Sequence, residues 1–112
     1  MVPEPSASEK CIPCRSDVPP LTPDAAGLLS RQVPRWELSA DARRLARTFI
    51  FGDFVEAMKF VNRVAGVAEQ QGHHPDIEIH YNRVKLNLWT HKINGLHAND
   101  FILAAHIDRL SP

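Results

Sequence analysis

The sequence has few cysteines, no long apolar run and no net charge, and each shortage argues against a class of protein. Basic and acidic residues number 13 each, so no electrostatic attraction to nucleic acid or to an anionic membrane is expected. No stretch of about 18 apolar residues is present, which argues against a transmembrane helix. The first residues lack the basic and apolar regions of a secretory signal, so we expect a cytoplasmic protein.

The two cysteines, Cys11 and Cys14, form a Cys-x-x-Cys motif. A structural zinc ion needs four ligands, and no second cysteine or histidine pair lies at a matching spacing. A redox motif would follow a strand and begin a helix, but the neighbouring prolines disfavour regular structure. We therefore interpret residues 1–20, which are rich in proline and serine, as a disordered tail. Residues 21–112 then form one folded domain.

Hydrophobic periodicity and capping residues predict alternating helices and strands in the folded domain. The expected elements are a helix over 23–30, strands over 36–38 and 45–51, a long helix from Asp53 to Gly72, strands over 77–81 and 84–89, and a helix over 98–110. The apolar residues that should line one face of the long helix are Phe54, Ala57, Met58, Val61, Val64, Ala65 and Ala68. This order predicts an antiparallel sheet covered by helices on one face.

Histidines are frequent, with 6 in the chain, and most lie in or beside the expected hairpin. His73 and His74 lie between the long helix and the next strand, with a glycine before them and a proline after. In a hairpin that turns at Asn82-Arg83, residue 74 lies approximately opposite residue 91, so His74 and His91 should meet at one end of the sheet. Histidine exchanges protons near neutral pH, and the cluster therefore indicates acid–base catalysis.

Other interpretations of the histidines are surface or capping roles and a metal site. Adjacent residues of an extended chain point to opposite sides, so His73 and His74 are poorly arranged to share one ion, and no metal is expected. Nucleophilic catalysis would need a motif such as Gly-x-Ser-x-Gly, and nucleotide chemistry a glycine-rich phosphate loop. The sequence contains neither of these motifs.

A specific spacing of residues runs from the long helix to the last one. Its positions are Glu69, His73-His74-Pro75, Tyr81, His91 and Asp100. This spacing resembles the signature of the pterin-4a-carbinolamine dehydratase family, and the likeness extends over residues 21–110. The resemblance implies an α+β fold with a four-stranded antiparallel sheet and helices on one face, assembled as a homodimer or homotetramer. It also implies a hydro-lyase that removes water from 4a-hydroxytetrahydropterin, giving quinonoid dihydropterin in tetrahydrobiopterin recycling, without metal or organic cofactor.

The resemblance also implies residue roles. His73 and His91 would protonate the departing hydroxyl, and His74 would bind the pterin and assist proton removal from a ring nitrogen. The residues implied to bind the substrate or to support the histidines are Trp36, Glu69, Pro75, Thr90, Lys92, Ile93 and Asp100. One position departs from the family, whose members usually have Thr or Ser where this chain has His97. We expect His97 to be an exposed and weaker cap of the last helix.

A second function class is a binding protein that keeps the fold without catalysis. Relatives of the family act as a dimerisation partner of a homeodomain transcription factor or as assembly factors for the carbon-fixing enzyme. The presence of His73, His74 and His91 favours catalysis over this role. A third interpretation, a metal-binding histidine protein, predicts stoichiometric zinc in the purified protein. The identity of the reduced pterin and the oligomer size stay open at this point.

Overall fold

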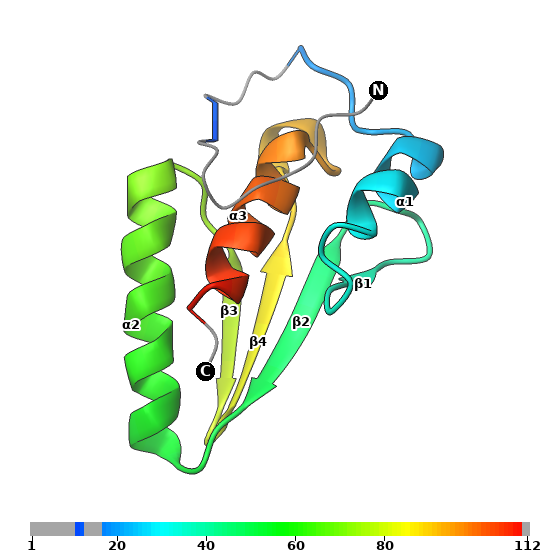
Figure 1. Cartoon of the computed structure of the whole chain (residues 1–112). Coiled ribbons are helices and arrows are strands. Elements are labelled where there is room, and N and C mark those ends of the chain that lie inside the picture. The colour runs from blue at the N-terminus through cyan, green and yellow to red at the C-terminus, as the bar shows by residue number, and fades with distance from the viewer. Residues whose placement is uncertain (1–10, 13–16, 111–112) are drawn as a thin grey trace.

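The computed structural model describes residues 11–12 and 17–110 of the chain (Figure 1). Its helices are α1 (Pro23–Ser30), α2 (Phe54–Gln71) and α3 (Ala98–Asp108), with a short 3₁₀ helix, η1 (His91–Ile93). Its strands are β1 (Glu37–Leu38), β2 (Leu45–Ile50), β3 (Asp76–His80) and β4 (Arg83–Leu88). The elements follow one another in the predicted order.

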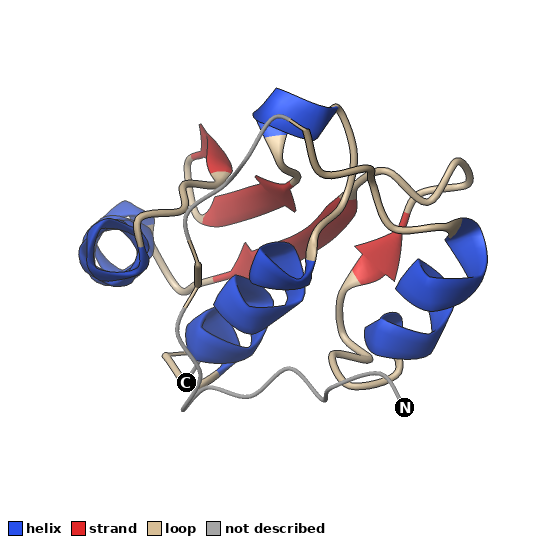
Figure 2. Cartoon of the chain, turned by 90° about the horizontal axis from the view of Figure 1, so that it is seen from above, coloured by secondary structure: helices blue, strands red, loops and turns tan. Residues whose placement is uncertain are grey.

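The strands form one four-stranded antiparallel sheet in the order β1-β2-β4-β3. The three α-helices lie on the same face of this sheet, as the view from above makes clear (Figure 2), which confirms the predicted α+β fold. The core lies between the two layers and includes Leu45, Phe49, Val84, Leu86 and Leu88 from the sheet and Phe60, Val64, Phe101 and Ile107 from the helices. Burying each of these large side chains stabilises the fold by about 1.5–3 kcal/mol.

Capping residues set the bounds of α1 and α2 where the sequence predicted them. The Thr22 hydroxyl accepts a hydrogen bond from the Ala25 N–H at 3.2 Å, and the Asp53 carboxylate accepts one from the Glu56 N–H at 2.8 Å. Helix α2 ends at Gly72, whose φ of 64° lies in the left-handed region that glycine adopts without strain. The chain therefore leaves α2 in a defined direction just before His73.

The buried face of α2 differs from the predicted one. Phe60, which was not in the predicted stripe, is buried, whereas Ala65 is exposed and Phe54 is 48% exposed. The Phe60 ring packs against Phe49 and Phe51, with ring centroids 4.5 and 5.1 Å apart. The buried face of α2 therefore includes Phe60, and Phe54 and Ala65 lie outside it.

The hairpin of β3 and β4 turns one residue earlier than predicted. The turn residues are Tyr81 and Asn82, with Tyr81 in the left-handed region at φ 53°, and His80 pairs with Arg83. The Asn82 carbonyl accepts a hydrogen bond from the Phe51 N–H, and the Asn82 amide donates one to the Phe51 carbonyl, each at 2.9 Å. These two hydrogen bonds hold the turn residue Asn82 against Phe51, which follows β2. The predicted pairing of residue 74 with residue 91 is therefore wrong by two positions.

The described part of the N-terminal segment contacts the folded domain. Cys11 and Ile12 form hydrogen bonds with residues of α2 and α3. The predicted tail otherwise lies largely outside the described residues, as does Cys14, so the boundary at residue 20 stays a prediction. Within the described residues, no helix is both long enough and apolar enough to cross a membrane.

Candidate active site

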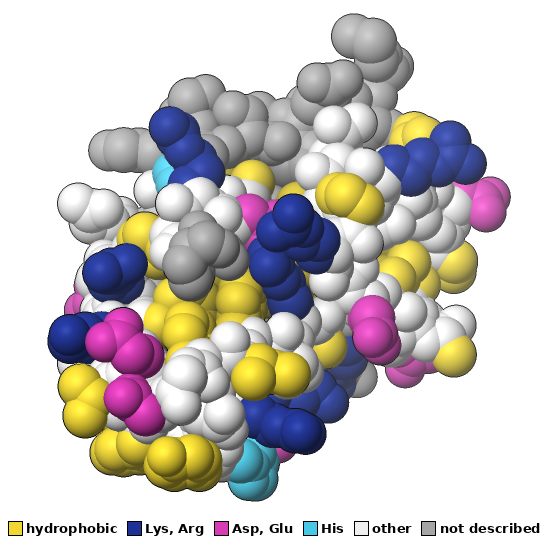
Figure 3. Space-filling model, turned by 60° about the horizontal axis from the view of Figure 1, so that its bottom comes forward, with side chains coloured by type: hydrophobic (Ala, Val, Ile, Leu, Met, Phe, Trp, Pro, Cys, Tyr) yellow, Lys and Arg dark blue, Asp and Glu magenta, His cyan; other side chains and the backbone are white. Residues whose placement is uncertain are grey.

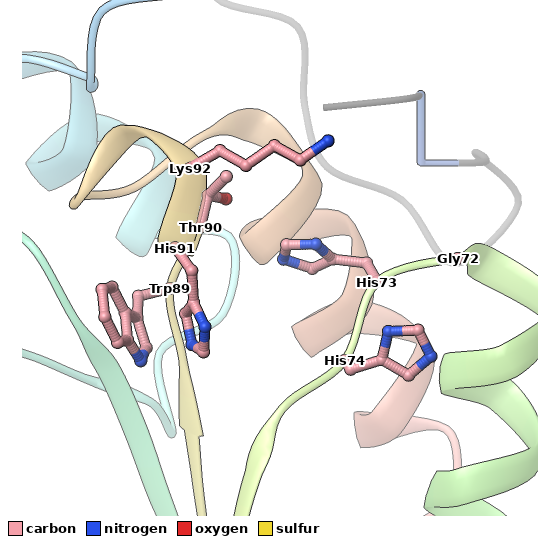
Figure 4. Close-up of a pocket in the computed structure, with 7 residues that line it drawn as sticks. All are labelled: Gly72, His73, His74, Trp89, Thr90, His91 and Lys92. Carbon is pink, nitrogen blue, oxygen red and sulfur yellow. The ribbon is translucent and has the colours of Figure 1, made fainter. Parts of the chain in front are cut away.

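A pocket of about 280 Å³ opens where α2 leads into β3 and β4 leads into η1 (Figure 4). Its walls are Gly72, His73, His74, Trp89, Thr90, His91 and Lys92. His73, His74 and His91 thus share one pocket, as the sequence predicted. The strand ladder ends at Asp76 and Leu88, so the three histidines lie in the segments just beyond the sheet. The antiparallel pairing of β3 with β4 brings the two segments together at this end of the sheet.

His73 is buried on the inner wall of the pocket and is held by Asp100 of α3. The distance from His73 Nε2 to Asp100 Oδ1 is 2.6 Å, and Asp100 is fully buried. The other carboxylate oxygen accepts hydrogen bonds from the Thr90 hydroxyl at 2.8 Å and from the His97 N–H at 3.0 Å. An ionised carboxylate only accepts, so this set of donors places a proton on His73 Nε2.

His97 caps α3 and places Asp100. Its Nδ1 accepts a hydrogen bond from the Asn99 N–H at 3.0 Å, while Asp100 accepts from the His97 N–H, which forms a complete capping box. Partial burial lowers the pKa of His97, and His73 adds to this effect while Asp100 opposes it. The neutral ring is the form that can accept at Nδ1. The prediction of an exposed cap is therefore wrong, because the imidazole is half-buried, and the weaker capping relative to Thr or Ser stays a prediction.

His74 lies on the outer rim beside Glu69, which is on the last turn of α2. The distance from His74 Nε2 to Glu69 Oε2 is 2.5 Å, and the side chains are 59% and 77% exposed. The chain reverses at Gly72, so the two residues come together across the helix end. The exposed His74 ring points toward α2 and away from His91 (Figure 4), whereas the ring of His73 next to it is buried.

His91 forms the opposite rim and stacks on Trp89 in a tilted arrangement, with ring centroids 3.9 Å apart and ring planes at 40°. Asp76 lies 3.8 Å from His91 Nε2 and accepts a hydrogen bond from the Trp89 indole N–H at 2.9 Å. The Arg44 guanidinium covers Trp89 at 3.6 Å from the ring centroid. The sequence did not predict a role in the site for Trp89, Asp76 or Arg44. Strand alternation was the available signal for Trp89, which precedes His91 by two positions and shares its side of the chain.

The remaining predicted residues are spread over the pocket and the core. Thr90 and Lys92 line the pocket, whereas Pro75 and Ile93 are half-buried neighbours of the lining residues. Trp36 is buried in the core, where its indole N–H donates to Asp108 at 2.8 Å. The structure therefore does not bring Trp36 to this pocket, because β1 lies at the edge of the sheet opposite β3. Among the described residues, no group of three or more His, Cys, Asp or Glu side chains is arranged to hold a metal ion.

Comparisons with known proteins show the family of the chain. The family model for pterin 4 alpha carbinolamine dehydratase matches residues 19–110. A protein of Methylococcus capsulatus, named "Putative pterin-4-alpha-carbinolamine dehydratase", is 48% identical over 104 residues, which cover 93% of this chain and 91% of the relative. A protein of Halorhodospira halophila with the same name is 49% identical over 100 residues, covering 89% of this chain and 92% of the relative.

Solved structures place the chain in the same class of fold. The crystal structure of a transcriptional coactivator/pterin dehydratase from Brucella melitensis has a TM-score of 0.77 and 30% identity, covering 83% of this chain and 99% of that one. A pterin dehydratase-like protein described as a RuBisCO assembly factor of the alpha-carboxysome has a TM-score of 0.58 and 23% identity, over 68% and 88% of the two chains, and shares the fold alone. The fold and pocket thus define a pterin dehydratase-like protein. The chain belongs to the pterin 4 alpha carbinolamine dehydratase family.

Proposed function

We propose that this protein is a 4a-hydroxytetrahydropterin dehydratase that works by histidine acid–base catalysis. One observation carries the proposal, namely that each of the three pocket histidines has a carboxylate beside it. The pairs are His73 with Asp100, His74 with Glu69, and His91 with Asp76. A carboxylate neighbour orients an imidazole ring for proton transfer. Because the three pairs converge on one pocket, the site is suited to give one proton and take another.

The proposed reaction breaks one carbon–oxygen bond. The substrate hydroxyl leaves carbon 4a with the bonding electrons and takes a proton from a histidine, departing as water. The adjacent ring nitrogen loses its proton to a base, and its electron pair forms the new carbon–nitrogen double bond. Protons and electrons therefore balance without an oxidant or reductant. Positioned acid–base groups accelerate such steps by about 10²–10⁴-fold.

The walls of the pocket suggest how these roles are divided. His73 and His91, on opposite sides of the pocket (Figure 4), are the proposed proton donors to the departing hydroxyl, one for each face of the pterin ring. His74, an exposed lining residue of the pocket, is the proposed pterin-binding residue that assists proton removal from the ring nitrogen. Thr90 and Lys92, with Pro75 and Ile93 beside them, are the proposed substrate contacts. Trp36 has no part in this proposal.

The test is a stopped-flow absorbance assay of 4a-hydroxytetrahydropterin dehydration. We expect the intact protein to accelerate the reaction, and His74→Ala and His91→Ala each to lose most of that acceleration. Both side chains are exposed, so their removal leaves the fold intact. His80→Ala is the matched control, because His80 lies on β3 near the hairpin turn and its side chain is 74% exposed. No acceleration by the intact protein would contradict the proposal and favour a non-catalytic binding or assembly role.

The proposal includes a setting for the reaction, which is tetrahydropterin recycling in the cytoplasm by a homodimer or homotetramer. The support for an oligomer is a set of exposed large apolar side chains at the end of the molecule away from the pocket, part of which is in view in Figure 3. These side chains are Ile50, Phe54, Val55, Ile79 and Tyr81. Analytical ultracentrifugation measures the oligomer, and a monomer at micromolar concentration would contradict this part of the proposal.

A further inference from the structure

Cys11 and Ile12 bridge the two helices that flank the pocket. The Cys11 N–H donates to Gln71 Oε1 at 2.8 Å. The Ile12 N–H donates to Asn99 Oδ1 at 2.9 Å, and Asn99 Nδ2 donates to the Ile12 carbonyl at 2.7 Å. Figure 1 draws these two residues as a short blue segment near the C-terminal end of α2. We refer to residues 11–12 as the bridging segment.

The partners of the bridging segment are next to the buried histidine–aspartate pair in the chain. Gln71 is the last residue of α2, two positions before His73. Asn99 lies in the first turn of α3, immediately before Asp100. The bridging segment therefore connects the same two chain segments as the contact between His73 Nε2 and Asp100 Oδ1. It joins them by its own backbone groups to the side chains of Gln71 and Asn99, whereas the pair joins them through the side chains of His73 and Asp100.

We propose that the bridging segment positions His73 against Asp100, with Asn99 and Gln71 as positioning residues. The termini of a helix are its most mobile part, because their backbone groups have fewer partners within the helix. Asp100 lies in the first turn of α3 and His73 follows the C-cap of α2, and a displacement of about 1 Å in a catalytic group can lower a rate by about 10²-fold. A cross-connection between the end of α2 and the start of α3 suppresses this displacement.

The contact depends on backbone groups rather than on the side chain of Ile12. That side chain is 61% exposed, so it adds little to the core, whereas Asn99 is 1% exposed and its amide faces the backbone of the segment. A buried amide that bonds both the N–H and the C=O of one residue selects a single placement of that residue. The bridge thus has a defined geometry that side-chain packing at residue 12 does not supply.

The first test compares Ile12→Pro with Ile12→Ala in the full chain. Proline removes the N–H that donates to Asn99 Oδ1, whereas alanine keeps both backbone groups and serves as the matched control. The readout is the nitrogen-bound ring proton of His73 in ¹H–¹⁵N NMR spectra, assigned with His73→Gln. We expect Ile12→Pro to shift this signal and to increase its solvent exchange about tenfold, and Ile12→Ala to leave it unchanged. An unchanged signal in Ile12→Pro would overturn the inference.

The second test uses the other anchor of the bridge. Gln71→Leu removes the oxygen that accepts from the Cys11 N–H, and Gln71→Glu retains it, so the glutamate variant should preserve the His73 signal that the leucine variant alters. If Ile12→Pro does not fold, the comparison of Gln71→Leu with Gln71→Glu tests the inference by itself. Ile12→Pro and Gln71→Leu should lower kcat for dehydration about tenfold while KM changes less than twofold, and Gln71→Glu should leave both unchanged, an arm that rests on the proposed function. A different result is that the parent chain shows no dehydratase activity while Ile12→Pro or Gln71→Leu still alters the His73 signal. That result would refute the proposed function and leave the bridge supported.

Discussion

The two sides of the pocket differ in how their histidines are held. On the inner side, His73 and Asp100 are 6% and 0% exposed, and the carboxylate accepts three hydrogen bonds. On the outer side, the side chains of His74 and His91 are 59% and 58% exposed, and each has a single carboxylate nearby. The inner side is thus part of the folded core, whereas the outer side is a surface arrangement.

This difference separates stability from catalysis within one small site. Removing one partner of a buried, hydrogen-bonded charge costs several kcal/mol, about 3–5 in typical cases, because the other groups lose their partners. An exposed ion pair contributes about 0–1 kcal/mol. We therefore expect inner-side substitutions to affect both folding and activity. Outer-side substitutions should affect activity alone, and this contrast can be tested one residue at a time.

The largest effect is expected for Asp100→Asn. The amide group replaces one accepting oxygen by a donor, so at least one of the three donors loses its acceptor. We expect the free energy of unfolding to fall by about 1–3 kcal/mol and the dehydration rate by about 10² or more. Urea unfolding followed by circular dichroism and stopped-flow kinetics measure the two quantities.

The control for this prediction is Asp76→Asn on the outer side, where the carboxylate is 53% exposed. It should change the free energy of unfolding by less than about 1 kcal/mol. Equal destabilisation by the two substitutions would remove the distinction between the two sides of the pocket.

A smaller effect is expected for Trp89→Ala, which removes the ring stacked on His91 and the indole N–H that donates to Asp76. Stacked ring pairs contribute about 0.5–1.5 kcal/mol, so kcat should fall about two- to tenfold. Trp89→Phe keeps the stack and loses only the N–H, and it should recover most of the rate. A phenylalanine variant as slow as the alanine variant would show that the hydrogen bond, not the stack, orients His91.

His97→Thr should change the pH dependence of stability. Burial lowers the pKa of His97 in the folded state below its ordinary value of 6.5, so the unfolded chain binds more protons just below that pH. The contribution of the neutral ring to stability is therefore complete above about pH 6.5 and is lost as the pH falls through the folded-state pKa. Threonine caps the helix without titrating.

As the pH falls from 7.5 to 5, the free energy of unfolding of the threonine variant should therefore rise relative to that of the parent chain. The expected difference is about 0.5–1 kcal/mol, the contribution of one helix cap. Thermal unfolding at a series of pH values measures this difference. His80→Ala serves as the control and should follow the parent chain, because His80 is exposed and caps no helix. A parallel pH dependence for the parent chain and the threonine variant would contradict the assigned role of His97.

The smallest effect is expected for Glu69→Gln, which removes the charge beside His74. Both side chains are mostly exposed, so the free energy of unfolding should change by less than about 0.5 kcal/mol. The rate of dehydration should fall only two- to threefold, because glutamine can still accept a hydrogen bond from the ring. A loss of stability above about 1 kcal/mol would mean that the outer side is coupled to the core.

The sequence by itself determined the elements whose signals are local. The N-cap at Asp53, the left-handed position at Gly72 and the intervening period of apolar residues predicted α2 with its correct bounds. The same reasoning located the remaining helices and the strands, because caps, turns and periodicity depend on residues only a few positions apart. The hairpin alone predicted that His74 and His91 meet at one end of the sheet, although its turn lies one residue earlier than predicted.

Only the tertiary structure decided which groups are buried and which turn the chain makes. His73 and His74 are neighbours in sequence, yet one is buried and the other exposed, because Asp100, 27 positions further along, covers only His73. Trp36 is buried in the core, where its indole N–H donates to Asp108, 72 positions away. The hairpin turns one residue earlier than predicted, where Asn82 forms hydrogen bonds with Phe51. Burial depends on packing between distant segments, and a local pattern of residues carries no information about which segments will meet.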